Sequence, residues 1–283
     1  MVKGFVLITG VSTGIGHHAV GYLIEKGYGV FGSIRKEADA KRLQNEFGEN
    51  YYPLIFDVTK AEEIQRAKIE LERILGDNKL VAIVNNAGIV KGGPIELLSD
   101  EDFRYQMEVN LFAVRNVTNI FVPLIKGNRE SKIKGGKIIM MSSISGYFNT
   151  PYNGAYCISK HAVESLAELY RREFYMYDVD VVSIQPGPIA SEIWNKNIDV
   201  CREFDDSDYS TLCHRSNKIM KREQKTALDP LVISKLIVKI IENKTKLKFV
   251  VNKNLFGTLL FTKWLPNRLV DKILYKHLFK NKS

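Results

Sequence analysis

The chain has 283 residues, of which 45% are hydrophobic and 26% charged, a composition that argues against long disorder, a collagen-like chain and a disulfide scaffold. Its three cysteines are far apart and no apolar run approaches the ~18 residues of a membrane-spanning helix, so we expect a soluble cytoplasmic protein with reduced thiols. The net charge of +9 is uneven, because residues 1–213 carry −4 and residues 214–283 carry +13.

Short apolar segments alternate along the chain with longer stretches of helical periodicity. Seven segments are typical of strands: Phe5–Thr9, Gly29–Ser33, Tyr52–Asp57, Leu80–Asn85, Lys137–Ser142, Val179–Gln185 and Lys248–Val251. Because these segments are uniformly apolar, we expect both faces of their sheet to be covered. The alternation predicts an α/β fold with a parallel sheet and right-handed crossovers. Two stretches interrupt it, a predicted flexible substrate loop at about 188–228 and a basic amphipathic extension at 252–283.

A glycine-rich loop follows the first predicted strand and leads into a helix. It reads Thr9-Gly10-Val11-Ser12-Thr13-Gly14-Ile15-Gly16. Gly10 permits a tight turn, Gly14 lets the backbone approach a pyrophosphate, and Gly16 lets the helix pack closely on the sheet. The free N–H groups at the start of the helix would face the anion. In this context the loop predicts a dinucleotide site.

The end of the second predicted strand bears on which dinucleotide is bound. A carboxylate there usually holds the ribose of NAD, whereas an arginine accommodates the 2′-phosphate of NADP. At this point the chain reads Gly32-Ser33-Ile34-Arg35-Lys36, which contains two cations and no carboxylate, and Ser12 is expected nearby. We therefore favour NADP(H), with NAD(H) as the alternative. Both cations could also be ordinary surface residues at the end of a strand.

Several motifs together resemble the short-chain dehydrogenase/reductase family over about residues 3–250. They are Thr9-Gly-x-x-x-Gly14-Ile-Gly16, Asn85-Asn86-Ala87-Gly88, Asn110, Ser143, Tyr156-x-x-x-Lys160 and Pro186-Gly187. The run from Ala155 to Lys160, followed by Val163-Glu164 and Arg171-Arg172-Glu173, is similar to the steroid and retinoid dehydrogenase branches. The resemblance implies a Rossmann-type three-layer fold in a single domain over 1–251, with a parallel seven-stranded sheet and helices on both faces.

The resemblance also implies roles for individual residues. Asp57 would contact the adenine ring, Ser191 the nicotinamide amide, and Lys160 the nicotinamide ribose. Asn110 would hold a water that links Lys160 to solvent. The cofactor-binding residues would be Gly10, Ser12, Thr13, Gly14, Ile15, Gly16, Arg35, Lys36, Asp57, Val58, Asn86, Ala87, Gly88, Tyr156, Lys160, Pro186, Gly187, Ile189 and Ser191. A homodimer or homotetramer is expected on the same ground.

The residue types of Ser143, Tyr156 and Lys160 indicate the chemistry, whereas the role of Asn110 comes from the resemblance alone. A phenol with a pKa of about 10 is a poor proton shuttle at neutral pH. Lys160 lies one helical turn beyond Tyr156, so its ammonium can favour the phenolate. A bound oxidised nicotinamide would add further positive charge, and Tyr156 then becomes a usable general acid or base. Ser143, or its neighbours Ser142 and Ser145, would hydrogen-bond the substrate oxygen and stabilise the charge that develops there. We expect interconversion of an alcohol and a ketone or aldehyde.

The substrate and the C-terminal extension are less defined. Phe148, Tyr152, Ile193 and Trp194 offer apolar walls for a lipophilic substrate, or they only pack the loop. No metal site is expected, because no histidine or cysteine pairs occur at ligand spacing. The basic extension would lie on a membrane interface, or form a helix over the pocket or at a subunit interface.

Three other functions remain as alternatives: a non-catalytic dinucleotide-binding regulator, a nucleic-acid binder that uses the basic tail, and a sugar-nucleotide epimerase. The intact Ser143, Tyr156 and Lys160 argue against the first. No recognisable element for reading bases supports the second, so no nucleic-acid partner is expected. The Asn85–Gly88 and Pro186-Gly187 motifs argue against the third.

Overall fold

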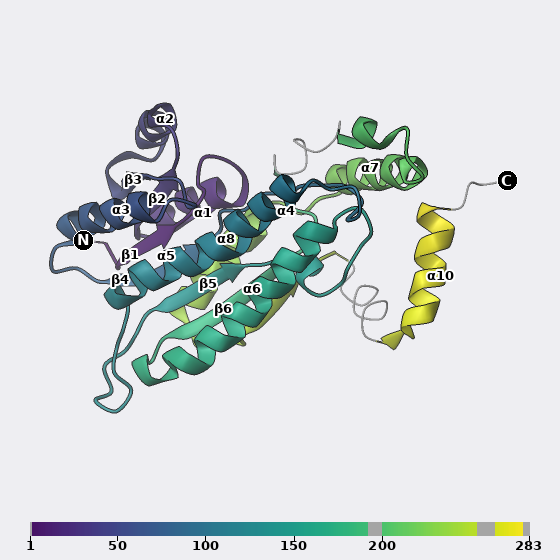
Figure 1. Cartoon of the computed structure of the whole chain (residues 1–283). Helices are drawn as coiled ribbons and strands as arrows, with labels where there is room; N and C mark the ends of the chain where they lie inside the picture. Colours follow the sequence, from purple (N-terminus) through teal and green to yellow (C-terminus); the bar gives the residue numbers. More distant parts are fainter. Residues whose placement is uncertain (1, 192–199, 254–263, 280–283) are drawn as a thin grey trace.

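A parallel seven-stranded sheet forms the centre of the protein (Figure 1). The computed structural model describes residues 2–191, 200–253 and 264–279. The strands lie in the order β3-β2-β1-β4-β5-β6-β7. They are β1 (Phe5–Ile8), β2 (Gly29–Ile34), β3 (Tyr51–Ile55), β4 (Leu80–Asn85), β5 (Lys137–Met141), β6 (Asp180–Pro186) and β7 (Lys248–Val251). Each strand lies where the apolar pattern predicts it, with ends that differ by at most two residues.

Helices cover both faces of this sheet, and two apolar cores fill the space between the layers. On one face lie α1 (Gly14–Glu25), α2 (Glu37–Phe47) and α8 (Leu231–Glu242), and on the other α3 (Ala61–Leu75), α5 (Ala113–Phe121) and α6 (Gly154–Glu173). Val6 and Ile8 of β1 belong to the first core, whereas Phe5 and Leu7 belong to the second. Alternate residues of a strand are therefore buried on opposite faces, which explains the uniformly apolar strands. The predicted three-layer Rossmann-type fold is confirmed.

Short helical segments complete the body of the structure. Between β4 and β5 the chain forms α4 (Asp100–Met107), then a π-helical turn η2 (Glu108–Phe112), and continues directly into α5. The 3-10 turns are η1 (Gly48–Asn50), η3 (Val122–Leu124), η4 (Ile144–Gly146), η5 (Phe174–Tyr177) and η7 (Val200–Phe204). Within the part of the chain that the structure describes, no helix has the length and apolar character needed to cross a bilayer.

The segment predicted as a flexible loop contains a helix, α7 (Ser210–Lys225), so the expectation of a loop is wrong there. The C-terminal helix α10 (Asn267–Leu278) packs against α7, and Figure 1 shows both at the end of the molecule away from α2. A third, smaller apolar cluster joins these elements: Tyr152, Cys201, Phe204, Leu212, Cys213, Met220 and Leu278, with Tyr209, Leu274 and Phe279 at its edge. Within the predicted extension, α10 thus packs one face on the protein, whereas residues 254–263 and 280–283 lie outside the described residues.

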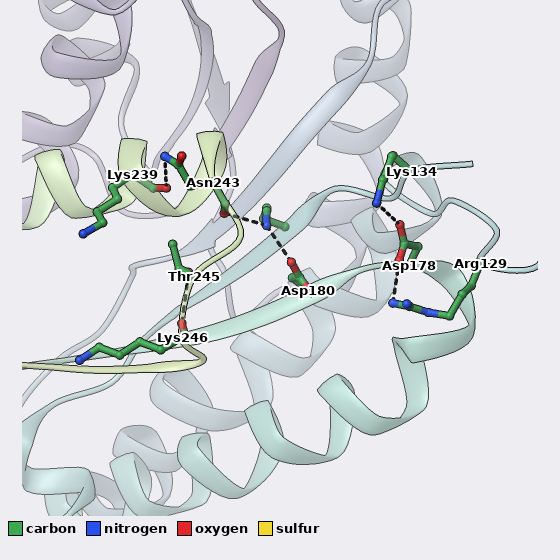
Figure 2. A network of polar contacts seen from close by, with 9 residues as sticks. Arg129, Lys134, Asp178, Asp180, Lys239, Asn243, Thr245 and Lys246 are labelled. Carbon is green, nitrogen blue, oxygen red and sulfur yellow. Dashed lines mark hydrogen bonds and ion pairs between the residues drawn. The ribbon is translucent and has the colours of Figure 1, made fainter. Parts of the chain in front are cut away.

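Ion pairs fix the ends of β5 and β6 where these strands begin (Figure 2). Lys137, the first residue of β5, places its Nζ 2.7 Å from Oδ2 of Asp180, the first residue of β6. Asp178, in the left-handed conformation with φ 53°, accepts ion pairs from Arg129 at 2.6 Å and Lys134 at 3.5 Å. These charges lie at the amino ends of the strands. A ligand site in an open parallel sheet lies at the opposite, carboxyl ends.

Candidate active site

A cavity of about 650 Å³ lies where the central strands end, the edge at which open parallel sheets bind ligands. It is lined by segments that follow β1, β2, β4, β5 and β6. Most of the predicted site residues meet there: Gly10, Ser12, Thr13, Gly14, Ile15, Arg35, Asp57, Val58, Asn86, Ala87, Gly88, Ser143, Tyr156, Lys160, Pro186, Gly187, Ile189 and Ser191. Residues more than 180 positions apart in the sequence therefore form one continuous surface.

The glycine loop has the backbone geometry that its sequence predicts. Gly10 and Gly14 adopt φ values of 71° and 64°, which side chains other than glycine rarely allow. Gly16 does not line the cavity but supports it, because a Cβ there would lie 2.5 Å from the carbonyl oxygen of Gly10. The loop and the first turn of α1 can therefore lie this close only with glycine at this position.

Side chains from β1 and the end of β4 lock this loop in place. Asn86 Nδ2 donates to the carbonyl oxygens of Thr9 at 2.9 Å and Gly10 at 3.0 Å. In return, Thr9 Oγ1 accepts from the backbone N–H groups of Asn86 and Ala87, each at 3.0 Å. From the sequence, Asn86 is predicted to contact the cofactor, and no separate role is predicted for Thr9. Both position the loop.

The start of α1 can hold an anion. Thr13, which precedes the helix, makes no side-chain capping bond, and the first turn has no acidic residue. The N–H groups at this end therefore remain available to phosphate oxygens. Ser191 approaches from the other side, since a Cβ at Gly14 would lie 3.2 Å from Ser191 Cβ. This cradle, which a side chain at Gly14 would fill, fits the pyrophosphate of a dinucleotide.

The adenosine end of the cavity contains Arg35 and Asp57. Arg35 follows β2 and is exposed, and no acidic residue in the described segments forms an ion pair with it. Asp57 is fixed, because its Oδ1 accepts from the N–H of Thr59 at 2.9 Å and from Thr59 Oγ1 at 2.8 Å. Lys36 directly precedes α2 and does not line the cavity, so the structure does not bring it to the predicted phosphate site.

Arg42 is a functional candidate that the sequence analysis missed. It lies on α2, and its Nη2 donates to the carbonyl oxygen of Ser12 in the glycine loop at 2.8 Å. The same nitrogen is 3.2 Å from Oδ1 of Asp39. Because no motif marks this position, only the packing of α2 beside the loop shows that Arg42 helps to hold it.

Tyr156 and Lys160 lie on α6, one turn apart, and face the cavity beside Ser143 at the end of β5. The Ser143 hydroxyl hydrogen-bonds the phenol of Tyr156. Lys160 is 5% exposed, and its Nζ donates to the carbonyl oxygen of Met141 at 2.8 Å and lies 5.7 Å from the centroid of the Tyr156 ring. The three groups predicted to carry the chemistry thus form one cluster.

Burial dominates the proton affinities of this cluster in the chain without cofactor. It raises the pKa of Tyr156 to about 12, although the hydrogen bond from Ser143 acts in the opposite direction. It also lowers the pKa of Lys160 to about 8, against the attraction of Glu164. In the chain without cofactor, burial therefore outweighs the charge of Lys160, and the expected contribution of a bound oxidised nicotinamide stays a prediction. Further positive charge at the site would be needed to lower the pKa of Tyr156.

Asn110 lies behind the cavity, in the π-helical turn η2, a type of irregularity that is frequent at functional sites. Its Oδ1 accepts from the N–H of Ile89 at 2.9 Å, and its Nδ2 donates to the carbonyl oxygen of Ile89 and to Ser159 Oγ. A Cβ at Gly88 would lie 3.3 Å from Asn110 Oδ1 and 3.7 Å from Lys160 Nζ. The two side chains thus converge, and the water proposed between them stays a prediction.

The predicted substrate walls are only partly where they were expected. Tyr152 is 2% exposed and packs against the far side of Gly92, with its hydroxyl 3.5 Å from Cys201 Sγ. Neither Tyr152 nor Phe148 is among the residues that line the cavity, so the position of Tyr152 fits the alternative in which it only packs the loop. Ile193 and Trp194 lie outside the described residues. The apolar walls come instead from Val90, Leu97, Leu98, Tyr105, Val109 and Phe204.

Comparison with known proteins agrees with this geometry. The sequence model of the family described as short chain dehydrogenase matches residues 4–200. The chain is 36% identical over 279 residues to the NADPH-dependent 3-dehydrocapnine reductase of Ornithobacterium rhinotracheale, covering 98% of both chains. It is 31% identical over 279 residues to the 3-ketodihydrosphingosine reductase of Bacteroides thetaiotaomicron, covering 97% of both.

A solved structure supports the fold independently. A short-chain dehydrogenase from Streptomyces avermitilis superposes with a TM-score of 0.74 at 20% identity, covering 98% of this chain and 96% of the other. At this identity the likeness concerns the arrangement of strands and helices.

Proposed function

We propose, on the premise that the chain belongs to the short-chain dehydrogenase family and is an NAD(P)-dependent oxidoreductase, that it uses NADPH to reduce a ketone on a long-chain, lipophilic substrate. The observation that carries the proposal is the single cavity. It joins Arg35 at the adenosine end, the Ser143, Tyr156 and Lys160 cluster in the middle, and an apolar surface beyond.

Two observations support NADPH. Arg35 stands at the end of β2 without an acidic partner among the described residues, where its guanidinium can form charge-assisted hydrogen bonds with a 2′-phosphate. No carboxylate occupies the positions around the end of β2 that would favour the free hydroxyls of NAD. The relative with 36% identity is named as NADPH-dependent, which supports the same preference.

The chain's own residues divide the work of carbonyl reduction. When bound, the nicotinamide supplies the hydride. Tyr156 donates its phenolic proton to the carbonyl oxygen, while the hydroxyl of Ser143 hydrogen-bonds that oxygen and stabilises the charge that develops on it. The ammonium of Lys160 stabilises the phenolate that remains on Tyr156, and Asn110, whose amide lies close to Lys160, would hold the water that connects the ammonium with solvent.

A lipophilic ketone fits the remainder of the cavity. Leu97, Leu98 and Phe204 form an apolar wall there, which suits an alkyl chain better than a sugar. The names of two full-length relatives both describe reduction at carbon 3, of a 3-dehydro and of a 3-keto compound. We therefore take 3-ketodihydrosphingosine, a long-chain amino ketone, as the first substrate to test.

Cofactor binding and turnover test this proposal together. We expect NADPH to bind more tightly than NADH, and Arg35→Ala to weaken NADPH binding about ten- to hundredfold, the cost of losing a charged hydrogen bond. Nicotinamide fluorescence measures the binding. NADPH oxidation with 3-ketodihydrosphingosine measures turnover, and Tyr156→Phe should abolish it.

Lys36→Ala is the matched control, because Lys36 is the neighbouring exposed cation and does not line the cavity. It should bind both cofactors like the wild type. A preference for NADH that Arg35→Ala leaves unchanged would contradict the NADPH assignment. NADPH oxidation that survives in Tyr156→Phe would contradict the proton donor.

We further propose that the outer face of α10 binds anionic lipid. Its inner face packs on α7, whereas Arg268, Leu269, Lys272, Tyr275 and Lys276 are exposed together on the other side. Trp264, just before the helix, is 77% exposed. Cations interleaved with aromatic and aliphatic side chains are typical of helices that lie on membrane interfaces. Such a position would suit an enzyme with a lipophilic substrate, and the observable consequence is salt-sensitive binding to anionic vesicles.

We also propose self-association through the helical layer that contains α5 and α6. Phe112 at the start of α5, and Ile158 and Leu169 on α6, are 43–49% exposed. These apolar side chains support a homodimer or homotetramer. Sedimentation velocity of the purified protein distinguishes either from a monomer, and a monomer at micromolar concentration would contradict the proposal.

A further inference from the structure

We infer that Glu203 binds an ammonium group of the substrate, so that the enzyme selects a lipophilic ketone that carries an amine. The inference rests on the proposed function and narrows its substrate class. It is carried by the position of Glu203 in the cavity and by the balance of charges around it.

Glu203 lies in η7 (Val200–Phe204), which borders the substrate end of the cavity. Its neighbour Phe204 fixes this position. A Cβ at Gly93 would lie 3.0 Å from Phe204 Cζ and 3.4 Å from Leu98 Cδ1, so η7 packs directly against the segment that follows β4. Glu203 therefore lines the cavity beside Phe204 and the apolar wall, at the end opposite to Arg35.

The other charges at this end cancel one another. Lys91 and Asp102 both line the cavity, and their side chains form an ion pair with Nζ 2.6 Å from Oδ1. Glu203 has no such partner, because no cation of the described segments lies within ion-pair distance of its carboxylate. Of the three charged side chains at this end, Lys91, Asp102 and Glu203, only Glu203 lacks an ion-pair partner among the described residues, and it lies next to an apolar surface.

This arrangement discriminates by charge. An ammonium offers three N–H donors, and a carboxylate accepts them in short, charge-assisted hydrogen bonds. A phosphate or carboxylate on the substrate would be repelled at the same place. The site would therefore bind anions and a cation at opposite ends. The cofactor's phosphates would lie at the start of α1 and at Arg35, and the substrate's ammonium at Glu203.

A pair of ketones tests the inference in neutral detergent micelles. One is 3-ketodihydrosphingosine, and the other is 1-hydroxyoctadecan-3-one, which lacks only the amine. For Glu203→Gln we expect KM for the amino ketone to rise about tenfold with kcat nearly unchanged, as for the loss of one hydrogen bond to a charged group. KM for the ketone without the amine should stay the same.

Asp206→Asn is the matched control, since Asp206 is an exposed acid two residues after η7 that does not line the cavity. It should change neither KM. The inference is overturned if the wild type reduces both ketones equally well, or if Glu203→Gln affects both alike; the proposed function would then still stand. Failure of the wild type to reduce either ketone while binding NADPH would instead overturn the proposed substrate class and this inference with it.

Discussion

Lys160 is buried at the end of β5, where its ammonium donates to the carbonyl oxygen of Met141. Burial lowers its pKa to about 8 from an ordinary value of 10.5, and Glu164, one turn further along α6, acts against this shift. A lysine in this position is charged at pH 7 at a cost to the folded state. The site therefore keeps a cation where the free energy of folding would favour a neutral side chain.

The dependence of stability on pH should reveal this cost. Between about pH 8 and 10.5 the unfolded chain binds a proton at Lys160 that the folded chain does not, so stability rises with pH through this window. Relative to Lys160→Met, the cofactor-free wild type should gain about 1.4 kcal/mol per pH unit there. Urea unfolding of both proteins at pH 7, 8.5 and 10 measures the difference.

Lys239→Met provides the control, because Lys239 is an exposed lysine of α8. Its stability difference from the wild type should not change over the same range. If the unfolding free energies of the wild type and Lys160→Met ran parallel with pH, Lys160 would not be the source of the titration.

At the scale of residues, the sequence does not predict how deeply a functional side chain is buried. The spacing of Tyr156 and Lys160 predicts that they share one face of a helix, and they do. It does not predict that both are almost completely buried. Because desolvation opposes charge on either group, the pKa of Tyr156 moves in the direction opposite to the one expected from its neighbour alone.

The glycine loop illustrates the next scale, at which one strand, one loop and one helix must fit together. Gly16 lies where α1 approaches the loop, and a Cβ there would meet the carbonyl oxygen of Gly10 at 2.5 Å and Asn86 Nδ2 at 2.6 Å. Asn86 already uses that nitrogen to hold the loop. A side chain at Gly16 would therefore displace the support of the cofactor site.

We expect Gly16→Ala to weaken NADPH binding at least about tenfold and to cost about 1–3 kcal/mol of stability, as overpacked sites do. The melting temperature should fall by several degrees. Gly21→Ala is the control on the same helix, since its Cβ would meet only the ring of Phe47, at 3.2 Å. Fluorescence titration and thermal unfolding provide the measurements. Wild-type binding by Gly16→Ala would show that the loop adapts.

Elements were predictable where local pattern and burial agree. The strands could be predicted because each contains a run of apolar residues that does not alternate with polar ones, such as Phe5–Ile8 of β1. Helix α7 was missed because its buried residues, Leu212, Cys213, Ser216 and Met220, are few and stand among polar neighbours. Their partner is α10, more than fifty residues later. The cofactor half of the site follows from motifs, whereas the substrate half depends on how such distant elements pack.

At the scale of the molecule, part of the basic charge of the last quarter of the sequence lies on α10, at one end of the protein (Figure 1). Helices α7 and α10 lie side by side at one end of the protein (Figure 1), and the outer face of α10 is cationic. The cavity borders the same region through η7. A lipid surface to which α10 binds would therefore lie near the substrate end of the cavity.

Charge reversal on this face tests the membrane proposal. We expect the wild type to co-sediment with vesicles that contain phosphatidylserine, and less so at high salt. The double substitution Lys272→Glu and Lys276→Glu should weaken binding at least about tenfold, since each cation near an anionic surface contributes about 1 kcal/mol. These exposed positions leave the contacts with α7 intact.

Lys235→Glu, on exposed α8 surface, is the control and should bind like the wild type. Equal sedimentation of the double variant and the wild type, or equal binding to neutral phosphatidylcholine vesicles, would contradict the proposal. Activity with a water-soluble ketone should be the same in all three proteins, because none of the changes touches the cavity.

The packing of α1 against α8 has a consequence for biosynthesis. Helix α1 ends at Glu25, but its partner α8 begins only at Leu231. In between, Val20 and Leu23, which are fully buried in the finished protein, have no helix to cover them. Nascent chains generally fold from the N-terminus as they emerge, yet this one cannot close the core between α1 and the sheet until α8 has been synthesised. We therefore expect the growing chain to need a chaperone until α8 has emerged.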